Sequence, residues 1–134
     1  MGYNFLIVSS ELALRIILID LIEKLDLKKF SITEADGILG AYLELKSNVK
    51  SVNCVIVDWH IPFGGGLELT KNIRESTDLN IKDDTPIIAL IENGESPVEA
   101  ISAGVNCCLE IFLSQEELKE KIDEVTKKEK VFNS

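Results

Sequence analysis

Short apolar runs alternate with segments of helical periodicity along the whole chain, and this alternation restricts the possible folds more than any other feature. Five runs are rich in Val, Ile and other β-forming residues and are predicted as strands, at residues 3–8, 30–35, 52–57, 86–91 and 105–112. Each is followed by a predicted helix, at about 11–25, 38–46, 67–74, 97–104 and 114–128. Two helix starts carry capping signals, Ser96-Pro97-Val98-Glu99 and Ser114-Gln115-Glu116-Glu117. The chain is therefore expected to repeat a strand–helix unit five times.

Residues 30–35 alternate as a half-exposed strand does, whereas other strand-like runs are nearly continuously apolar. Residues 52–57 (VNCVIV) and 86–91 (PIIALI) have the pattern of strands buried on both faces, as in a parallel sheet between two layers of helices. We therefore predict a doubly wound α/β domain with a five-stranded parallel sheet. It would form one domain over residues 1–134, with a core at about 3–128 and a tail at 129–134. Ligands of such folds bind beyond the carboxyl ends of the strands, where the strand order reverses.

Composition excludes several classes of protein. A length of 134 residues suits one domain, and a hydrophobic content of 46% argues against disorder. A net charge of −9 argues against direct binding to nucleic acid, and the apolar runs are too short to cross a membrane. We find no secretory signal, and three cysteines (Cys54, Cys107, Cys108) fit reduced thiols better than a disulfide framework. We therefore expect a cytoplasmic protein.

One motif gives the chain a family resemblance. The stretch from Val57 to Leu69, VDWHIPFGGGLEL, resembles the phospho-acceptor motif of response-regulator receiver domains. In that family an Asp ends the third strand, a Pro follows four residues later and a Gly opens the third helix. Residues 5–8 and 103–106 resemble the family's first strand and the turn before its fifth strand. The resemblance extends over about 5–128 and implies a flavodoxin-like fold, with Asp58 at the phospho-acceptor position.

Most other functional positions of the family carry different residues here. In the family an acidic pair follows the first strand, Thr or Ser ends the fourth strand, Lys and then Pro end the fifth strand, and an aromatic switch residue lies within the fifth strand. The matching positions in this chain are Ser9 and Ser10 (followed by Glu11), Ile91, Ile111 with Phe112, and Cys108. The acceptor Asp58 is retained, whereas the groups that bind metal and phosphoryl oxygens in the family are replaced.

These replacements bear directly on phosphoryl transfer, which brings an anionic donor to an anionic acceptor and depends on positioned positive charge. By the resemblance, Mg²⁺ would be held by Asp58 and the main-chain carbonyl of His60, with Ser10 as a neutral ligand and Glu11 one residue late. Ile111 offers no cation to the phosphoryl group. We therefore expect a degenerate receiver that signals by protein–protein contact. We expect no enzymatic activity and no cofactor, with Mg²⁺ bound only if the acceptor site is active.

Two other functions stay open at this stage. The first is an active stand-alone response regulator that a histidine kinase phosphorylates on Asp58. The second is a domain that binds a small ligand or cofactor in the same cleft. In the receiver interpretations the partner is a histidine kinase, a phosphotransfer protein or an output protein, without direct nucleic-acid or membrane binding. Trp59 is expected to be half exposed beside the site and thus to report on it.

The first predicted helix is apolar on more than one side. One face is expected to pack on the sheet and comprises Leu14, Ile17, Leu18, Leu21 and Leu25. A second stripe comprises Leu12, Ile16 and Ile19. This stripe predicts either a surface for a partner or a homodimer, or a face that the last helix covers.

Overall fold

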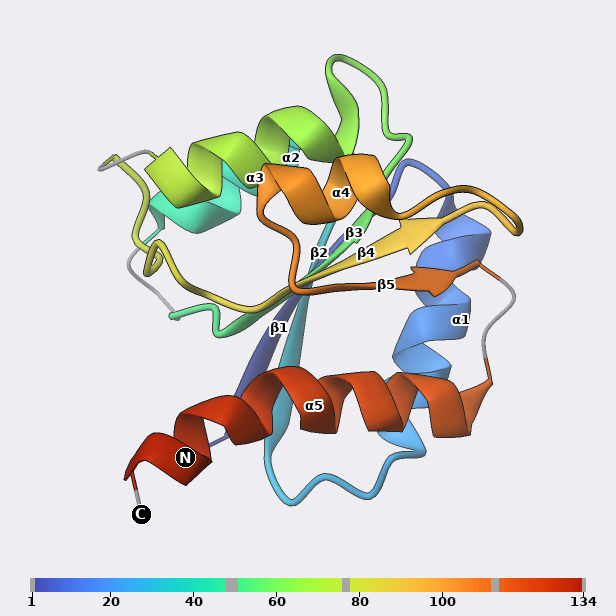
Figure 1. Cartoon of the computed structure of the whole chain (residues 1–134), viewed down its shortest axis with the longest axis vertical. Coiled ribbons are helices and arrows are strands. Elements are labelled where there is room, and N and C mark those ends of the chain that lie inside the picture. Colours follow the sequence, from blue (N-terminus) through green and yellow to red (C-terminus); the bar gives the residue numbers. More distant parts are fainter. Residues whose placement is uncertain (1, 48–50, 76–77, 112–113, 134) are drawn as a thin grey trace.

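Five parallel strands form one sheet in the order β2-β1-β3-β4-β5 (Figure 1). The computed structural model describes residues 2–47, 51–75, 78–111 and 114–133, with side chains up to residue 126. Its strands are β1 (Tyr3–Val8), β2 (Phe30–Ala35), β3 (Cys54–Asp58), β4 (Ile87–Ile91) and β5 (Cys107–Glu110). Because β1 pairs with both β2 and β3, the strand order reverses at β1, as the doubly wound prediction requires.

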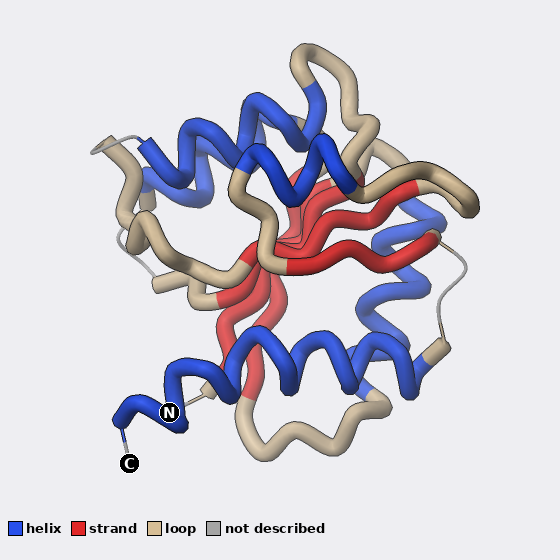
Figure 2. The backbone as a smooth tube through the Cα atoms, in the orientation of Figure 1, coloured by secondary structure: helices blue, strands red, loops and turns tan. Residues whose placement is uncertain are grey.

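Five helices cover the two faces of this sheet. They are α1 (Leu12–Glu23), α2 (Ile38–Lys46), α3 (Gly65–Glu75), α4 (Val98–Ala103) and α5 (Gln115–Asn133). Helices α1 and α5 lie on one face, whereas α2, α3 and α4 lie on the other (Figure 2). None of the helices in the described residues is long and apolar enough to cross a membrane. The strand order and the two layers of helices confirm the predicted flavodoxin-like architecture.

Each face of the sheet has its own hydrophobic core because successive side chains of a strand point to opposite faces. In β3, Val55 and Val57 belong to the core under α2, α3 and α4, whereas Ile56 belongs to the core under α1 and α5. In β5, Cys107 and Cys108 divide between the two cores in the same way. The strands that carry the candidate site are thus anchored from both sides.

Helix α1 is rotated relative to the predicted face. Its buried residues are Leu14, Leu18 and Ile22, whereas Ile17, predicted to pack on the sheet, is 52% exposed. Leu21 is only partly buried, although Leu25 beyond the helix is buried as predicted. The prediction was right for Leu14, Leu18 and Leu25 and wrong for Ile17, because a helix this apolar carries more than one stripe with the correct spacing.

One of the two predicted capping boxes forms. At the start of α5, Ser114 Oγ accepts a hydrogen bond from Glu117 N, and Glu117 Oε1 accepts one from Ser114 N. At α4, Ser96 Oγ accepts from the N–H of Val98, but the Glu99 side chain binds elsewhere.

Several element limits also differ from the predictions. Strand β3 begins at Cys54, β5 is shorter than predicted, and α3 begins two residues earlier than expected. Residues 129–133, which were predicted to be part of a tail, belong to helix α5.

Candidate functional site

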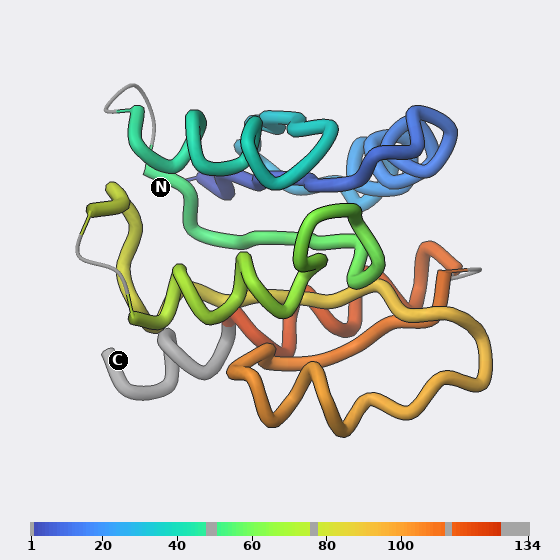
Figure 3. The backbone as a smooth tube through the Cα atoms, turned by 90° about the horizontal axis from the view of Figure 1, so that it is seen from above, coloured from blue at the N-terminus to red at the C-terminus, as the bar shows by residue number. Residues whose placement is uncertain are grey.

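The candidate site lies at the carboxyl end of the sheet, where the central strands stop. Asp58 is the last residue of β3 and is 8% exposed, and Ser9 follows directly after β1. Ile91 ends β4, and the N–H of Ile111 donates to its carbonyl oxygen at 2.9 Å. In Figure 3 the loops that follow β3 and β4 lie at this same end of the sheet. Parallel pairing therefore brings together residues that are up to about a hundred positions apart in the sequence.

The carboxylate of Asp58 has a hydrogen-bond donor on each of its oxygens. Ser9 Oγ donates to Oδ2 at 3.1 Å, and the His60 N–H donates to Oδ1 at 3.2 Å. Ser9 is fully buried, and its Oγ also accepts a hydrogen bond from the Glu11 N–H at 3.1 Å. Ser9 therefore links the acceptor aspartate to the backbone at the start of α1. Sequence reasoning placed Ser9 at a degenerate position and missed this link.

The side chain of Arg15 contacts the backbone of Ser9 at this edge. Arg15 Nη1 donates to the carbonyl oxygen of Ser9 at 2.6 Å, and Arg15 Nε forms an ion pair with Glu34 at 3.1 Å. This guanidinium is thus committed to a backbone carbonyl and to a carboxylate on β2.

A histidine–glutamate ion pair joins the two loops beside the cleft. His60 Nε2 lies 2.8 Å from each carboxylate oxygen of Glu95, and Glu95 Oε1 also accepts from the Glu92 N–H. The hydrogen bond to Glu95 raises the pKa of His60. Burial tends to raise the pKa of Glu95, but the hydrogen bonds from His60 and the Glu92 backbone together lower it. Both shifts favour the charged pair.

Trp59 is buried, in contrast to the prediction that it would be half exposed. Its side chain is 4% exposed, and its indole Nε1–H donates to Glu99 Oε1 at 2.9 Å. The glycine-rich loop packs against it: a Cβ on Gly66 would lie 2.5 Å from Trp59 Cε3, and one on Gly65 would lie 2.8 Å from Trp59 O. Gly65 also has a φ of 66°, which favours glycine. Trp59 and these glycines therefore fix the backbone that follows Asp58.

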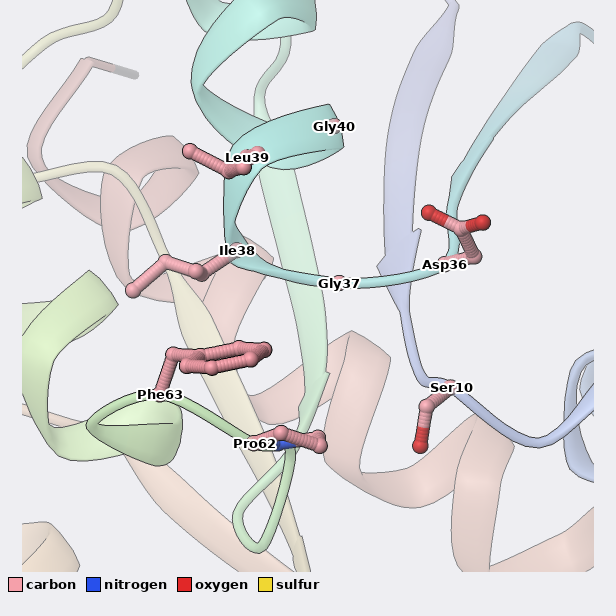
Figure 4. Close-up of a pocket in the computed structure, with 8 residues that line it drawn as sticks. All are labelled: Ser10, Asp36, Gly37, Ile38, Leu39, Gly40, Pro62 and Phe63. Atoms are coloured by element: carbon pink, nitrogen blue, oxygen red, sulfur yellow. The ribbon is translucent and has the colours of Figure 1, made fainter.

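The other residues predicted for the site differ in how far they are buried. Ile91 is buried, whereas Ile111 is partly buried against the α1–α5 core. Cys108 is partly buried, and burial raises the pKa of its thiol. Ser10 is exposed and lines a neighbouring hollow, shown in Figure 4. Glu11 is exposed as well. Phe112 lies outside the described residues.

The oxygen ligands that the cleft offers fit a magnesium ion poorly. Mg²⁺ is bound through one or two carboxylates plus waters in near-octahedral geometry. Here the carboxylate of Asp58 accepts hydrogen bonds on both oxygens, from the Ser9 hydroxyl and from the His60 N–H. Within the described part of the chain, no cluster of three or more His, Cys, Asp or Glu residues is placed to hold a metal.

Comparisons with known proteins identify the family. The sequence model of the response regulator receiver domain matches residues 5–123. The chemotaxis protein CheY homolog of Campylobacter jejuni is 34% identical over 84 residues, which span 61% of this chain and 62% of that protein. CheY-3 of Vibrio cholerae is 33% identical over 94 residues, or 69% of this chain and 68% of that protein.

A solved structure agrees with these matches at the level of the fold. The receiver domain of the sensor histidine kinase PA1611 from Pseudomonas aeruginosa, with magnesium coordinated in its active-site cleft, has a TM-score of 0.76 at 20% identity. The superposition covers 92% of this chain and 97% of that one. With the family match over most of its length, the chain belongs to the response regulator receiver domain family.

Proposed function

We propose that this chain is a receiver-type signalling domain that acts by protein–protein contact without the Mg²⁺-dependent phospho-aspartate switch. Receiver domains are signalling domains of two-component systems and typically bind Mg²⁺ at the phosphorylation site. One observation carries the proposal: both oxygens of Asp58 are hydrogen-bonded to neutral protein donors, Ser9 and the His60 backbone. The carboxylate is thereby stabilised without a metal.

Two apolar residues at positions of the family's functional groups support the same proposal. Ile91 and Ile111 occupy the positions at which the family has a hydroxyl and a lysine. A unit charge 4 Å from the transferred group contributes about 4 kcal/mol at an effective dielectric constant of about 20, or roughly a thousandfold in rate. The loss of a metal ion and a lysine together would therefore slow phosphoryl transfer far more than one residue could restore.

The alternative is an active receiver that a histidine kinase phosphorylates on Asp58. The position of Asp58 favours this alternative, because its carboxyl group ends a central strand at the ligand-binding edge of the sheet. In that case the metal ligands would be Asp58, the His60 carbonyl, Ser10 and Glu11. In both cases we expect the chain to act in the cytoplasm on a histidine kinase, a phosphotransfer protein or an output protein.

A titration with Mg²⁺ and beryllium fluoride, which mimics an aspartyl phosphate, distinguishes the two functions. The backbone amide resonances of Asp58 and His60 report on the cleft directly, with Asp58→Asn as the control variant. We expect no saturable shift of these resonances at millimolar Mg²⁺, with or without beryllium fluoride. A saturable shift that Asp58→Asn abolishes would establish the active receiver and overturn the proposal.

A restored variant tests the physical reason for this expectation. The changes Ser9→Asp, Ser10→Asp, Ile91→Thr and Ile111→Lys return the family's residue types to the four positions. We expect this variant to gain Mg²⁺-dependent thermal stabilisation, which amounts to about 2.7 kcal/mol at a hundredfold excess over Kd. Equal Mg²⁺ responses of the restored and natural chains would show that these positions do not limit metal binding.

A further inference from the structure

Among the described residues, six large apolar side chains are exposed on α1, α2 and the loop after β3: Ile17, which is 52% exposed, and five more. The exposed fractions of these five are 59% for Leu12, 56% for Ile16, 74% for Leu39, 73% for Leu43 and 88% for Phe63. We call the surface formed by these five residues the α1–α2 face. Single exposed apolar residues are common, but a group carried by adjacent elements marks an interaction site. Ile19, predicted to belong to this surface, packs against the α1–α5 core instead.

Two adjoining hollows make this face concave. The first, of about 230 Å³, lies between the start of α2 and the loop after β3, with Ile38, Leu39, Pro62 and Phe63 among its lining residues (Figure 4). The second, of about 390 Å³, lies between α1 and α2 over the end of β2 and includes Leu12 and Leu43. Asp36 and Gly40 line both hollows, and we call these two neighbouring hollows together the groove.

The backbone holds Phe63 outward at an energetic cost. Its φ of 63° lies in the left-handed region, which a bulky residue rarely adopts. The side chain is nevertheless the most exposed of the large apolar residues in the described chain. Strain of this kind persists where the surrounding structure enforces it and is concentrated at binding sites.

The charges around the groove select the partner. Glu34, Asp36 and Glu44 line its α1–α2 half, together with the single cation Arg15. The guanidinium of Arg15 is engaged by Glu34 and by a backbone carbonyl, so the rim is acidic overall. The whole chain carries a net charge of −9. A second copy would bring like charges together, whereas a basic partner would be attracted.

We propose that the α1–α2 face binds one amphipathic helix of a partner protein, with an apolar stripe flanked by Lys or Arg residues. This inference rests on the proposed function, because it supplies the protein contact through which a receiver without a phosphorylation switch would act. Leu39 and Leu43 lie one helical turn apart, and so do Leu12 and Ile16. Apolar residues at spacings of three, four and seven on the partner helix would meet both pairs, with its cations near Asp36 and Glu44.

The test uses a fluorescein-labelled helical peptide of 16 designed residues, about 24 Å long, with leucines on one face and lysines elsewhere. Binding is followed by fluorescence anisotropy. The double variant Leu39→Ser with Leu43→Ser should weaken binding at least tenfold. The matched control, Val98→Ser with Ile101→Ser, changes two exposed apolar residues on α4 (67% and 46% exposed) and should alter binding less than twofold.

Two further peptides separate the apolar and the charged contributions. A peptide of the same composition with its leucines spread around the helix should bind at least tenfold more weakly. A peptide with glutamates in place of the lysines should also lose at least tenfold. Circular dichroism of each protein variant establishes that the fold is retained.

Several outcomes would overturn the docking proposal. Equal binding of the scrambled peptide, or unchanged binding by the Leu39/Leu43 variant, would show that only net charge attracts the peptide. Self-association of the chain in sedimentation, abolished by the same variant, would assign the face to a second copy. Repeating the anisotropy with Asp58→Asn and with beryllium fluoride separates the two proposals. Binding that requires an intact, liganded Asp58 would retain the docking site but overturn the switch-independent function.

Discussion

The replacement Ser9→Ala isolates the interaction that stabilises the candidate site. Ser9 is fully buried, and its hydroxyl donates to the Asp58 carboxylate at 3.1 Å while accepting the Glu11 N–H at 3.1 Å. Alanine fits the same space, so the variant removes these two hydrogen bonds without a large change in packing. It also leaves one oxygen of a carboxylate that is only 8% exposed without its protein donor.

The expected loss of stability follows from these two bonds. A hydrogen bond to a charged group contributes about 1.5–3 kcal/mol, and a neutral one about 0.5–1.5 kcal/mol. We therefore expect the free energy of unfolding at pH 7 to fall by about 2–4 kcal/mol. With a urea m-value of about 2 kcal/mol/M, this lowers the urea midpoint by about 1–2 M at unchanged slope.

Ser10→Ala is the matched control, because it makes the same chemical change at the next residue, which is exposed. Its effect should stay within about 0.5 kcal/mol. The double variant Ser9→Ala with Asp58→Asn should lose less than the two single variants combined, because the two residues interact directly. Equal losses from Ser9→Ala and Ser10→Ala, or strictly additive losses with Asp58→Asn, would refute the role assigned to Ser9.

Three further predictions concern the surroundings of the site. Gly66→Ala should lower the free energy of unfolding by about 1–3 kcal/mol, because the new Cβ would lie 2.5 Å from a buried indole ring. Gly37→Ala, with no heavy atom within 4 Å of its Cβ, should cost only about 0.5–1 kcal/mol in the same urea titration, from the change of the N-cap residue of α2. Arg74→Met should cost about 2–4 kcal/mol in thermal unfolding, because the guanidinium donates to three backbone carbonyls and one side-chain amide beside β4 and β5. A retained Tm would contradict this role. The exposed His60–Glu95 pair should add up to about 1 kcal/mol. Because the pKa of His60 is raised, its share is complete below the ordinary value of 6.5 and is lost as the pH rises through the folded pKa. Because the pKa of Glu95 is lowered, its share is complete above 4.5 and is lost as the pH falls through the folded pKa. His60→Asn should therefore be less stable than the natural chain at pH 5.5 and equal to it at pH 9; an equal deficit at both values would contradict the pairing.

The fold could be predicted from sequence because its determinants are local. The apolar runs and helical segments occur in an order that a parallel sheet accommodates with simple crossovers. The Ser114 and Glu117 capping box joins residues three apart and forms as predicted. The rotation of α1 was not predicted, because Ile17 and Ile22 are both aliphatic and only the packing of α1 against the sheet and α5 distinguishes them.

The central residue of the candidate site could be predicted from sequence, whereas the hydrogen bonds around it could not. The place of Asp58 at the end of a strand follows from the alternation and the motif. Its partner Ser9 lies 49 residues away, and the hydrogen bond between Trp59 and Glu99 spans 40 residues. Neither pair has a spacing signal, because the contacts arise only after the strands are paired. Glu99 was predicted to cap the start of α4, but its side chain accepts the hydrogen bond from Trp59 instead.

The replacements around Asp58 are physically consistent with one another. A carboxylate in place of Ser9 would stand near Asp58 and repel it by about 4 kcal/mol at 4 Å and an effective dielectric constant of about 20, a cost that a bound metal would offset. Serine at position 9 carries no charge that repels Asp58. Its hydroxyl donates a hydrogen bond to the Asp58 carboxylate, which stabilises that group as a metal ion would. Ile91 and Ile111 then require no polar partner, and both lie against the cores. Among the described residues, the one buried side-chain polar atom without a hydrogen-bond partner is Thr70 Oγ1, which belongs to α3 and not to the strand ends around Asp58. Both oxygens of Asp58 have protein donors, which is the basis of our proposal that the cleft is stable without metal and that partners contact other surfaces of the domain.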